Sequence, residues 1–399
     1  MKREIVLYLF FLSIFVTGCS SDKQSYEDLP CIDVSKDYPE KEINLTDIAD
    51  VTYLHLNTAN DDYLYRGNIN YVTQNTIVVI DQSSHSLLFF SRDGNPKSHF
   101  NRKGQGPEEY LGVESILYDE AKDDVYVLPG YFSVSRYINV YSSSGKYKRK
   151  LTLPQPNMDN QMCFFDDLSI LVYDNSKLWR NIGKKYREDK TAFMEQVDST
   201  FFLISKTDGT ALEYIKLPNN NIDISSFGDL ERTFWGQIPY ARVRKCPDGL
   251  FLYNPETDTV FLYGKDKSLT PYMYKKPLLS DLDPMIVMDI CMNVGRFQCI
   301  SVIPYSANGG SSPAKYYMRD KKNGEIFRQK IILPDYKGKD FYIDPRLSNY
   351  YEKECHFELD LIELKEAYKE NRLSGKLKEL VATLNEDKDN NVFMFVHFK

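Results

Sequence analysis

The chain has 399 residues, of which 50 are Lys or Arg and 57 are Asp or Glu, so its formal net charge at pH 7 is −7. This mildly acidic balance, without a clustered basic face, argues against nucleic-acid binding, which needs Lys and Arg to neutralise phosphates. A chain of this length can also bury a large core without disulfide staples.

The N-terminus has the pattern of an export signal. Lys2 and Arg3 precede an apolar run over residues 5–16, and Gly18 stands directly before Cys19. The run is shorter than the roughly 20 residues that cross a bilayer as a helix. Small residues before a cysteine resemble the lipobox of bacterial lipoproteins, in which the cysteine is acylated. We therefore expect residues 1–18 to be a lipoprotein signal peptide and Cys19 to be lipidated; a secreted protein with an incidental cysteine is the alternative.

After the signal peptide, the sequence predicts a tether and one folded body. Residues 19–40 are mostly polar and show neither helical nor strand periodicity, so they are expected to form a flexible tether behind Cys19. Residues 41–399 are expected to form the folded body, because no segment in them is long and apolar enough to span a membrane.

Five stretches of this body share one order of elements. Each has an apolar strand, a polar loop, a second strand with aromatic residues, a Gly- or Lys-rich turn, and a third strand. The stretches cover residues 76–100, 125–154, 168–218, 249–277 and 297–334. Their turn centres fall at residues 94, 145, 209, 267 and 324. A repeat of this length, built from antiparallel strands, is typical of a β-propeller blade.

The two ends of the body predict a sixth blade. Residues 50–56 and residues 391–398 both have the pattern of strands, and pairing them would close the ring and remove exposed sheet edges. Apolar residues at helical spacing between about 358 and 385 predict a small helical insertion before the last strand. We expect this insertion to pack on the propeller, and a docking helix for a partner is the alternative. The predicted fold is all-β, a six-bladed β-propeller closed by its N- and C-terminal strands.

Four features occur together in the order expected of one family. They are the lipobox ending at Cys19, the entry segment 44–51, the Gly-x-Gly-Pro-x-Glu-Tyr pattern in the loop 102–110, and the C-terminal stretch 377–398. With them the whole chain resembles the six-bladed β-propeller lipoproteins of Bacteroides and related gut bacteria. The resemblance implies this fold and export, and no activity. Together with the lipobox it predicts a cell-envelope protein, an outer-membrane lipoprotein that faces the periplasm or the surface.

The glycine-rich loop 102–110 allows two interpretations. Its backbone N–H groups could bind an anion, but the loop has no Gly-Lys-Ser/Thr ending and no strand-to-helix context. The preferred interpretation is a turn between blades, in which Gly104 and Gly106 permit sharp bends and Tyr110 packs.

Six cysteines remain besides Cys19, and none forms a Cys-x-x-Cys pair or has the spacing of zinc ligands. They are Cys31, Cys163, Cys246, Cys291, Cys299 and Cys355. Free thiols are expected, and a disulfide between Cys291 and Cys299 across a hairpin is the alternative.

Two functional hypotheses follow. The preferred one is a non-catalytic, monomeric binding or scaffolding propeller without a cofactor, whose partner is a glycan, a peptide or a protein. Aromatic platforms bind sugars by stacking, and the best candidates for a ligand face are Trp179, Arg180, Trp235 and Tyr240, although core packing is the alternative role for aromatic residues.

The second hypothesis is a calcium-dependent hydrolase or lyase with its site in the central channel. Calcium prefers carboxylate and carbonyl oxygens, and Glu114, Asp119 and Asp289 lie near expected inner strands. Ordinary turn residues would look the same. The five histidines are dispersed and no Gly-x-Ser-x-Gly pattern is present, so the sequence nominates no catalytic residue.

Overall fold

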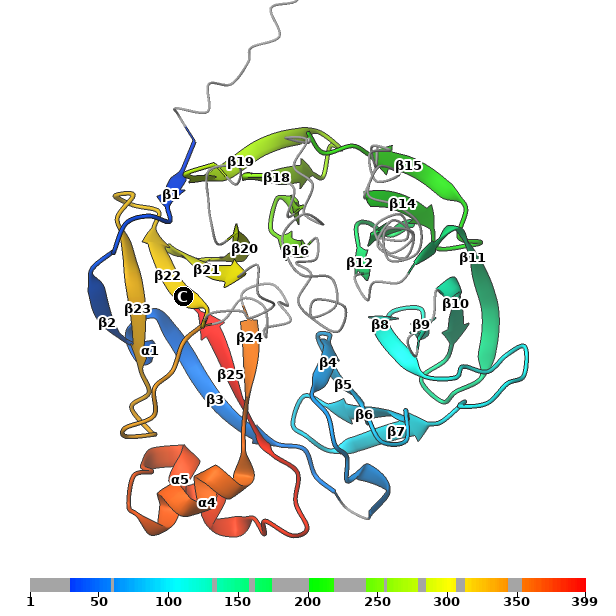
Figure 1. The fold of residues 1–399 in the computed structure, drawn as a ribbon. Coiled ribbons are helices and arrows are strands. Elements are labelled where there is room, and N and C mark those ends of the chain that lie inside the picture. Colours follow the sequence, from blue (N-terminus) through cyan, green and yellow to red (C-terminus); the bar gives the residue numbers. More distant parts are fainter. Residues whose placement is uncertain are drawn as a thin grey trace, which may run out of the picture.

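The chain folds into six small sheets arranged in a ring, a six-bladed β-propeller, as predicted (Figure 1). We analyse it in a computed structural model. The residues that the structure describes are 29–58, 61–130, 135–157, 162–173, 201–218, 242–254, 257–278, 285–305, 313–343 and 354–399. Among them, no helix is both long and apolar enough to cross a membrane.

Blades one to five each contain four antiparallel strands that follow one another in the chain, from the innermost (first) strand to the outermost (fourth). Blade one has β4 (Ile69–Val72), β5 (Thr76–Ile80), β6 (Leu87–Ser91) and β7 (Pro96–Phe100). Blade two has β8 (Val113–Asp119), β9 (Asp124–Pro129), β10 (Ser135–Tyr141) and β11 (Tyr147–Asn157). Blade three has β12 (Met162–Phe164), β13 (Ser169–Tyr173), β14 (Phe201–Ser205) and β15 (Ala211–Ile215).

The next two blades continue this order. Blade four has β16 (Arg242–Cys246), β17 (Gly249–Tyr253), β18 (Thr259–Gly264) and β19 (Leu269–Lys276). Blade five has β20 (Met285–Val294), β21 (Phe297–Tyr305), β22 (Lys315–Asp320) and β23 (Ile326–Ile332).

The middle strands of the blades are buried on both faces. In β5, β13 and β17 every residue is buried, because each sheet is covered by a neighbouring blade on either side. Such strands are continuous apolar runs without alternation. The fourth strands β7 and β15 alternate between half-buried and exposed residues until their last, buried residue, because they lie at the rim.

The predicted turn centres are the turns between the third and fourth strands. Each holds a residue with positive φ, which glycine adopts without strain. These residues are Gly94 (85°), Gly145 (81°), Gly209 (84°), Lys267 (66°) and Gly324 (77°).

The predicted closure of the ring is confirmed. Blade six consists of β24 (Glu354–Leu359), β25 (Val392–Phe398) and β3 (Ala49–His55), and β25 pairs with β3 from Val392↔His55 to Phe398↔Ala49. After β3 the chain passes through the short 3-10 helix η2 (Asp61–Tyr63) into blade one, so β3 is the fourth strand of its blade. By this order β24 takes the second position, and no described strand occupies the first.

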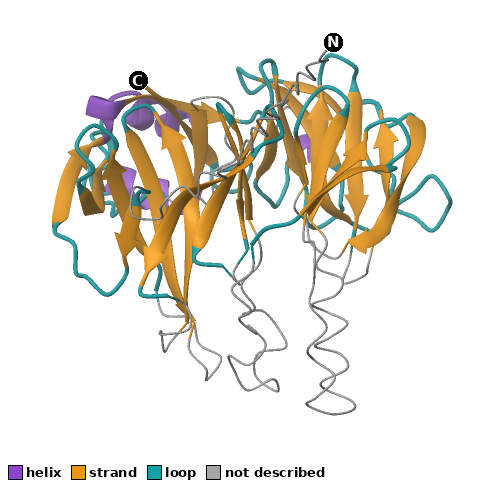
Figure 2. Ribbon diagram, turned by 90° about the horizontal axis from the view of Figure 1, so that it is seen from above, coloured by secondary structure: helices purple, strands orange, loops and turns teal. Residues whose placement is uncertain are grey.

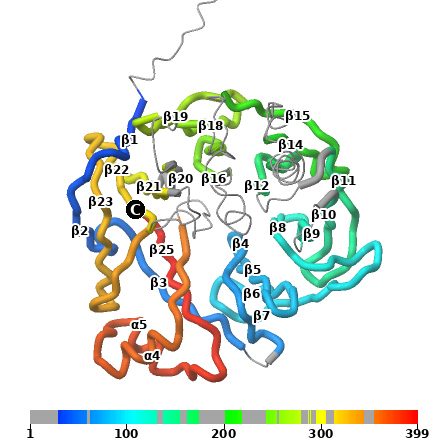
Figure 3. The backbone as a smooth tube through the Cα atoms, in the orientation of Figure 1, coloured from blue at the N-terminus to red at the C-terminus, as the bar shows by residue number. Residues whose placement is uncertain are grey.

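The chain before β3 runs along the outside of two further blades. β1 (Cys31–Asp33) pairs in parallel with β19 of blade four, and β2 (Glu40–Asn44) pairs in parallel with β23 of blade five. The short helix α1 (Leu45–Ile48) then leads into β3. We call residues 31–55 the N-terminal strap, and Figure 3 shows it as the blue tube along the rim.

The strap changes one predicted boundary. β1 lies inside the stretch 19–40 that was expected to be tether, so regular structure begins earlier than predicted. The reason is the hydrogen bonding available at the edge of β19 together with the full burial of Ile32. Three residues with one buried side chain leave no periodic pattern in the sequence.

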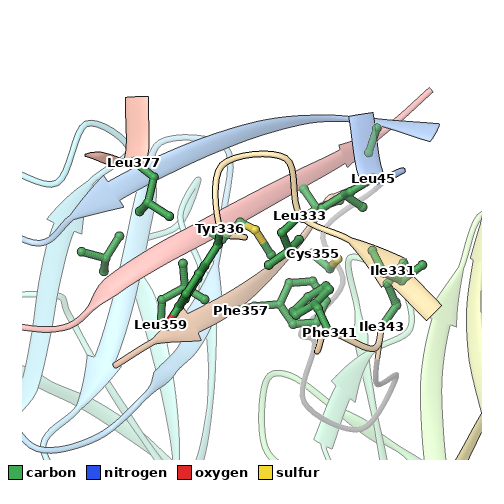
Figure 4. Close-up of a cluster of buried hydrophobic side chains, with 14 of the residues drawn as sticks. Leu45, Ile331, Leu333, Tyr336, Phe341, Ile343, Cys355, Phe357, Leu359 and Leu377 are labelled. Atoms are coloured by element: carbon green, nitrogen blue, oxygen red, sulfur yellow. The ribbon is translucent and has the colours of Figure 1, made fainter. Parts of the chain in front are cut away.

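Two helices, α4 (Leu361–Lys369) and α5 (Gly375–Thr383), lie within the predicted range 358–385, between β24 and β25. Their apolar residues Leu361, Leu364, Leu377 and Val381 are buried, so the helices pack on the propeller as expected. Figure 4 shows the cluster that they join, in which Leu377 lies in one core with Leu45 of the strap and with side chains of blades five and six.

The cysteines whose side chains the structure describes are free, as preferred from the sequence, and they are Cys31, Cys163, Cys246, Cys299 and Cys355. Because Cys299 is free, the alternative hairpin disulfide with Cys291 is not formed in this structure. Burial raises the pKa of the Cys299 thiol to about 12, which keeps it protonated and unreactive.

Candidate functional site

The antiparallel order gives the ring two unlike faces, which Figure 2 shows edge-on. On one face, the turn face, short turns join first to second and third to fourth strands, for example residues 73–75 and 92–95. On the other, the connection face, second strands lead to third strands and each blade leads to the next. Its connections are longer, for example residues 81–86 and 101–112.

Polar contacts between blades lock the turn face. The Glu120 carboxylate of blade two accepts hydrogen bonds from the hydroxyls of Thr73 (2.9 Å) and Thr76 (2.5 Å) in blade one. Within blade two, Asp124 binds both Lys148 and Arg149 at 2.7 Å, and Arg149 also donates a hydrogen bond to the carbonyl of Lys206 in blade three (3.0 Å). Burial opposes ionisation of Asp124, but the hydrogen bonds from Arg149 and Lys148 lower its pKa below the usual value. These side chains are used for cohesion of the ring.

Asp119, a candidate calcium ligand, belongs to this turn face. It ends β8 and forms ion pairs with Lys122 (3.6 Å) and with Lys206 of blade three (3.8 Å). Its carboxylate therefore joins two blades.

Glu114, the second candidate, lies at the opposite end of the same innermost strand. The two residues are five positions apart, about 17 Å along a strand, so they cannot bind one ion together. The backbone of Gly130 packs closely on Glu114, because a Cβ placed on Gly130 would lie 2.6 Å from the Glu114 Cβ. The side chain reaches solvent, yet the protein around it raises the pKa of its carboxyl by desolvation. No described residue donates a hydrogen bond to it.

Asp289, the third candidate, lies on β20, the innermost strand of blade five, where it pairs with Ser301. Its side chain is outside the described part of the structure. Blades two and five lie on opposite sides of the ring, so the strands carrying Glu114 and Asp289 face each other across it (Figure 1). Among the described residues, no group of three or more His, Cys, Asp or Glu side chains could hold a metal ion.

The four residues predicted for a ligand face, Trp179, Arg180, Trp235 and Tyr240, lie outside the described residues, as does Cys19. Trp179 and Arg180 belong to the segment that connects β13 to β14, and Trp235 and Tyr240 belong to the segment that connects β15 to β16. The strand ends that flank these segments lie on the connection face.

The glycine-rich loop has the structural role preferred from its sequence. Gly104 N–H donates to the carbonyl of Tyr110 (3.0 Å), and Gly106 N–H donates to the Glu109 carboxylate (2.8 Å). The buried Tyr110 donates its hydroxyl to the carbonyl of His85 in blade one (3.0 Å). Because both glycine amides are bonded within the loop, neither is available to an anion.

The structure adds one aromatic pair that the sequence analysis missed. The rings of Tyr316 and Tyr342 are stacked, with centroids 5.3 Å apart and planes at 21°. Tyr316 is near the start of a third strand, β22, and Tyr342 follows β23 in the chain, so both belong to the connection face. Tyr342 is 42% exposed. The chain has 30 tyrosines, and no pattern distinguishes these two from those that pack in the core.

Comparison with known proteins gives the family and supports the fold. The family model described as domain of unknown function DUF4934 matches residues 29–276. The chain is similar to a solved structure of a Bacteroides fragilis protein whose name describes it as exported. The TM-score is 0.60 and the sequence identity is 18%, over 91% of this chain and 99% of that one. No curated protein matches the sequence.

Two enzymes are more distant. Virginiamycin B lyase from Staphylococcus aureus has a TM-score of 0.41 and 10% identity, over 88% of this chain and 100% of that one. A xyloglucanase from Xanthomonas campestris has a TM-score of 0.40 and 10% identity, over 77% of this chain and 43% of that one. Likeness at this level says nothing about activity. The family model covers more than half of the sequence, and the chain therefore belongs to the DUF4934 family, a family of unknown function.

Proposed function

We propose that the protein is an exported lipoprotein, held at the outer membrane by acylated Cys19, whose ring is a non-catalytic binding module. The observation that carries the binding role is the difference between the two faces. The turn face is closed by short turns and inter-blade ion pairs, whereas the connection face has the long connections. Loops held on a rigid scaffold are where binding residues usually lie.

Among a glycan, a peptide and a protein partner, a glycan fits the described residues best. The exposed ring of Tyr342, supported from behind by Tyr316, offers a flat apolar surface for a sugar ring. Glu114, on the innermost strand β8, offers an acceptor for hydroxyl groups, because no described residue donates a hydrogen bond to its carboxylate.

The binding role is tested with the mature full-length protein on a glycan array, followed by calorimetry with any glycan retained. Tyr342→Ala and Glu114→Gln should each weaken binding at least tenfold. Lys97→Ala, near the turn face in blade one, is the control and should bind as the wild type does. A retained glycan whose affinity none of these substitutions changes would contradict the proposed face.

The anchor is tested separately. Cells that express the protein are fed a clickable fatty acid, and the label should enter the wild type and be absent from Cys19→Ser. The variant should also leave the membrane fraction, since the acyl chains supply the attachment. A labelled Cys19→Ser protein would disprove acylation at this residue.

The alternative function is a calcium-dependent hydrolase or lyase in the channel. One observation favours it, the raised pKa of Glu114 on an innermost strand, since general acids are often desolvated carboxyls. A ligand that binds only the folded state raises the unfolding temperature. If millimolar calcium raises the unfolding temperature of the wild type but not that of Glu114→Gln, the enzyme is favoured. If the unfolding temperature of the wild type does not change, the binding module is favoured.

A further inference from the structure

The outer edges of some blades are paired with a further strand, and those of other blades are not. β1 covers the edge of β19 in blade four, and β2 covers the edge of β23 in blade five, both as parallel strands. The fourth strands of blades one, two and three are β7, β11 and β15, and no described strand pairs with their outer edges. A free edge presents unpaired N–H and C=O groups to any extended chain that approaches.

Two of these three edges carry the residues that usually prevent such pairing. β7 begins with Pro96 and Lys97. β11 contains Lys148, Arg149 and Lys150 in a row, followed by Pro154 and Pro156. Charged side chains and prolines at a sheet edge discourage the addition of a further strand.

β15 has neither of these protections. Its sequence is Ala-Leu-Glu-Tyr-Ile, and it exposes 52% of Leu212 and 47% of Tyr214. Its single charge, Glu213, is already engaged, because the carboxylate accepts a hydrogen bond from Tyr263 (2.8 Å) and pairs with Lys267 (3.3 Å) in blade four. Among the residues that the structure describes, nothing pairs with the outer edge of β15, which carries two exposed apolar side chains on one face.

We propose that the outer edge of β15 is the docking site for an extended peptide segment of a partner protein, which adds to blade three as a parallel fifth strand. The neighbouring blade provides the model for this interface. There, β1 runs parallel to β19 in register from Cys31↔Tyr274 to Asp33↔Lys276, and Ile32 is fully buried. The partner strand would likewise pair through its backbone and present alternate apolar side chains to Leu212 and Tyr214.

The chemistry of the site favours a partner over this chain's own N-terminal residues. Residues 20–28 read Ser-Ser-Asp-Lys-Gln-Ser-Tyr-Glu-Asp, with no aliphatic residue to contact Leu212. A strand with a β-branched or aromatic residue at every second position fits the edge of β15 better. In the same way, β1 buries the β-branched Ile32 and β2 buries the β-branched Ile43.

The proposal is tested with a fluorescent synthetic peptide of alternating Val or Ile and Thr residues, titrated into the mature full-length protein. The peptide should bind, and a version with proline at every second position should not, because proline removes backbone donors. Leu212→Lys should weaken binding at least tenfold. Leu168→Lys is the matched control, because Leu168 is 75% exposed on the turn before β13, and it should bind as the wild type does.

Hydrogen exchange completes the test and does not depend on a variant. In the free protein, the outward amides of β15 should exchange quickly, and the peptide should protect them. Protection that is already present at every protein concentration would mean that the chain covers its own edge. Protection that appears only at high concentration would mean a second copy. Either result, or binding that survives Leu212→Lys, would overturn the proposal.

Discussion

The guanidinium of Arg92, on the turn between β6 and β7, is hydrogen-bonded to the carboxylate of Glu354, 262 positions later at the start of β24. The contact joins blade one to blade six, the blade in which the two ends of the chain pair. The same guanidinium lies 5.0 Å from the centre of the Phe395 ring on β25. Side chains as well as the backbone ladder therefore hold the ring closed.

Removing one member of this pair should destabilise the closure. We expect Arg92→Ala to lower the free energy of unfolding by about 2 kcal/mol, because it leaves a partly buried carboxylate without its partner. The measurement is urea unfolding of Arg92→Ala, Glu354→Gln and the double variant. The double variant should lose less than the sum of the two single losses. Strict additivity would show that the two residues do not stabilise each other.

Buried residues of β25, the strand that closes the ring, should contribute far more to the free energy of unfolding than its exposed residue does. Phe393 on β25 is fully buried, facing blade one, and Phe393→Ala should cost about 4 kcal/mol in unfolding free energy. His397 on the same strand is exposed, and His397→Ala should change stability by less than about 0.5 kcal/mol. Thermal and urea unfolding of both variants test this. Equal losses would mean that β25 is not packed between two blades.

His356 should make the stability depend on pH. Burial lowers the pKa of this imidazole on β24 from 6.5 to about 4, since its ring packs near those of Phe393 and Phe395 on β25. Between these two values the unfolded chain binds more protons than the folded one. The free energy of unfolding should therefore fall by about 3 kcal/mol as the pH is lowered from 6.5 to 4.

The measurement for His356 is a series of urea titrations across this pH range. The variant His356→Gln keeps a side-chain donor and should remove most of the decrease. The control His397→Gln, at an exposed position, should retain it. A decrease of the same size in His356→Gln would assign the effect to other groups.

Two glycines with similar backbone angles should differ in their tolerance of alanine. Gly209 and Gly324 have φ values of 84° and 77°, so alanine is strained at both, by roughly 1 kcal/mol. A Cβ on Gly209 would also lie 2.6 Å from the carbonyl oxygen of Thr152 in blade two, whereas Gly324 has nothing within 4 Å. Gly209→Ala should thus be the more destabilising by about 1 to 3 kcal/mol in urea unfolding. Equal effects would place the turn away from blade two.

The parts of the fold in which burial or backbone geometry selects particular residue types could be predicted from the sequence. The middle strands, such as β5 and β17, are continuous apolar runs because neighbouring blades cover both faces. Four of the five turns, at Gly94, Gly145, Gly209 and Gly324, could be located because a left-handed backbone position selects glycine. The pairing of residues 50–56 with 391–398 followed from the need to close the ring.

Other parts of the fold, namely β1, β2 and the register of β8, correspond to weaker sequence patterns. Each of β1 and β2 buries one isoleucine, Ile32 or Ile43, and gains most of its hydrogen bonding from another blade's edge. The innermost strand β8 mixes exposed and buried residues without a clean period, so its register was not apparent. For that reason Glu114 and Asp119 could be placed near an inner strand, but not at opposite ends of the same strand.

The pairing of β3 with β25 also orders events in time. Val392 is paired with His55, 337 residues earlier, so β3 has no partner strand until β25 has been synthesised. Contacts this distant along the chain form slowly, because a large loop must be closed before they are rewarded. A chain cut short anywhere before residue 392 would keep β3 unpaired and its blade open. A protein truncated between β3 and β25 would therefore offer the unpaired edge of β3 to proteases.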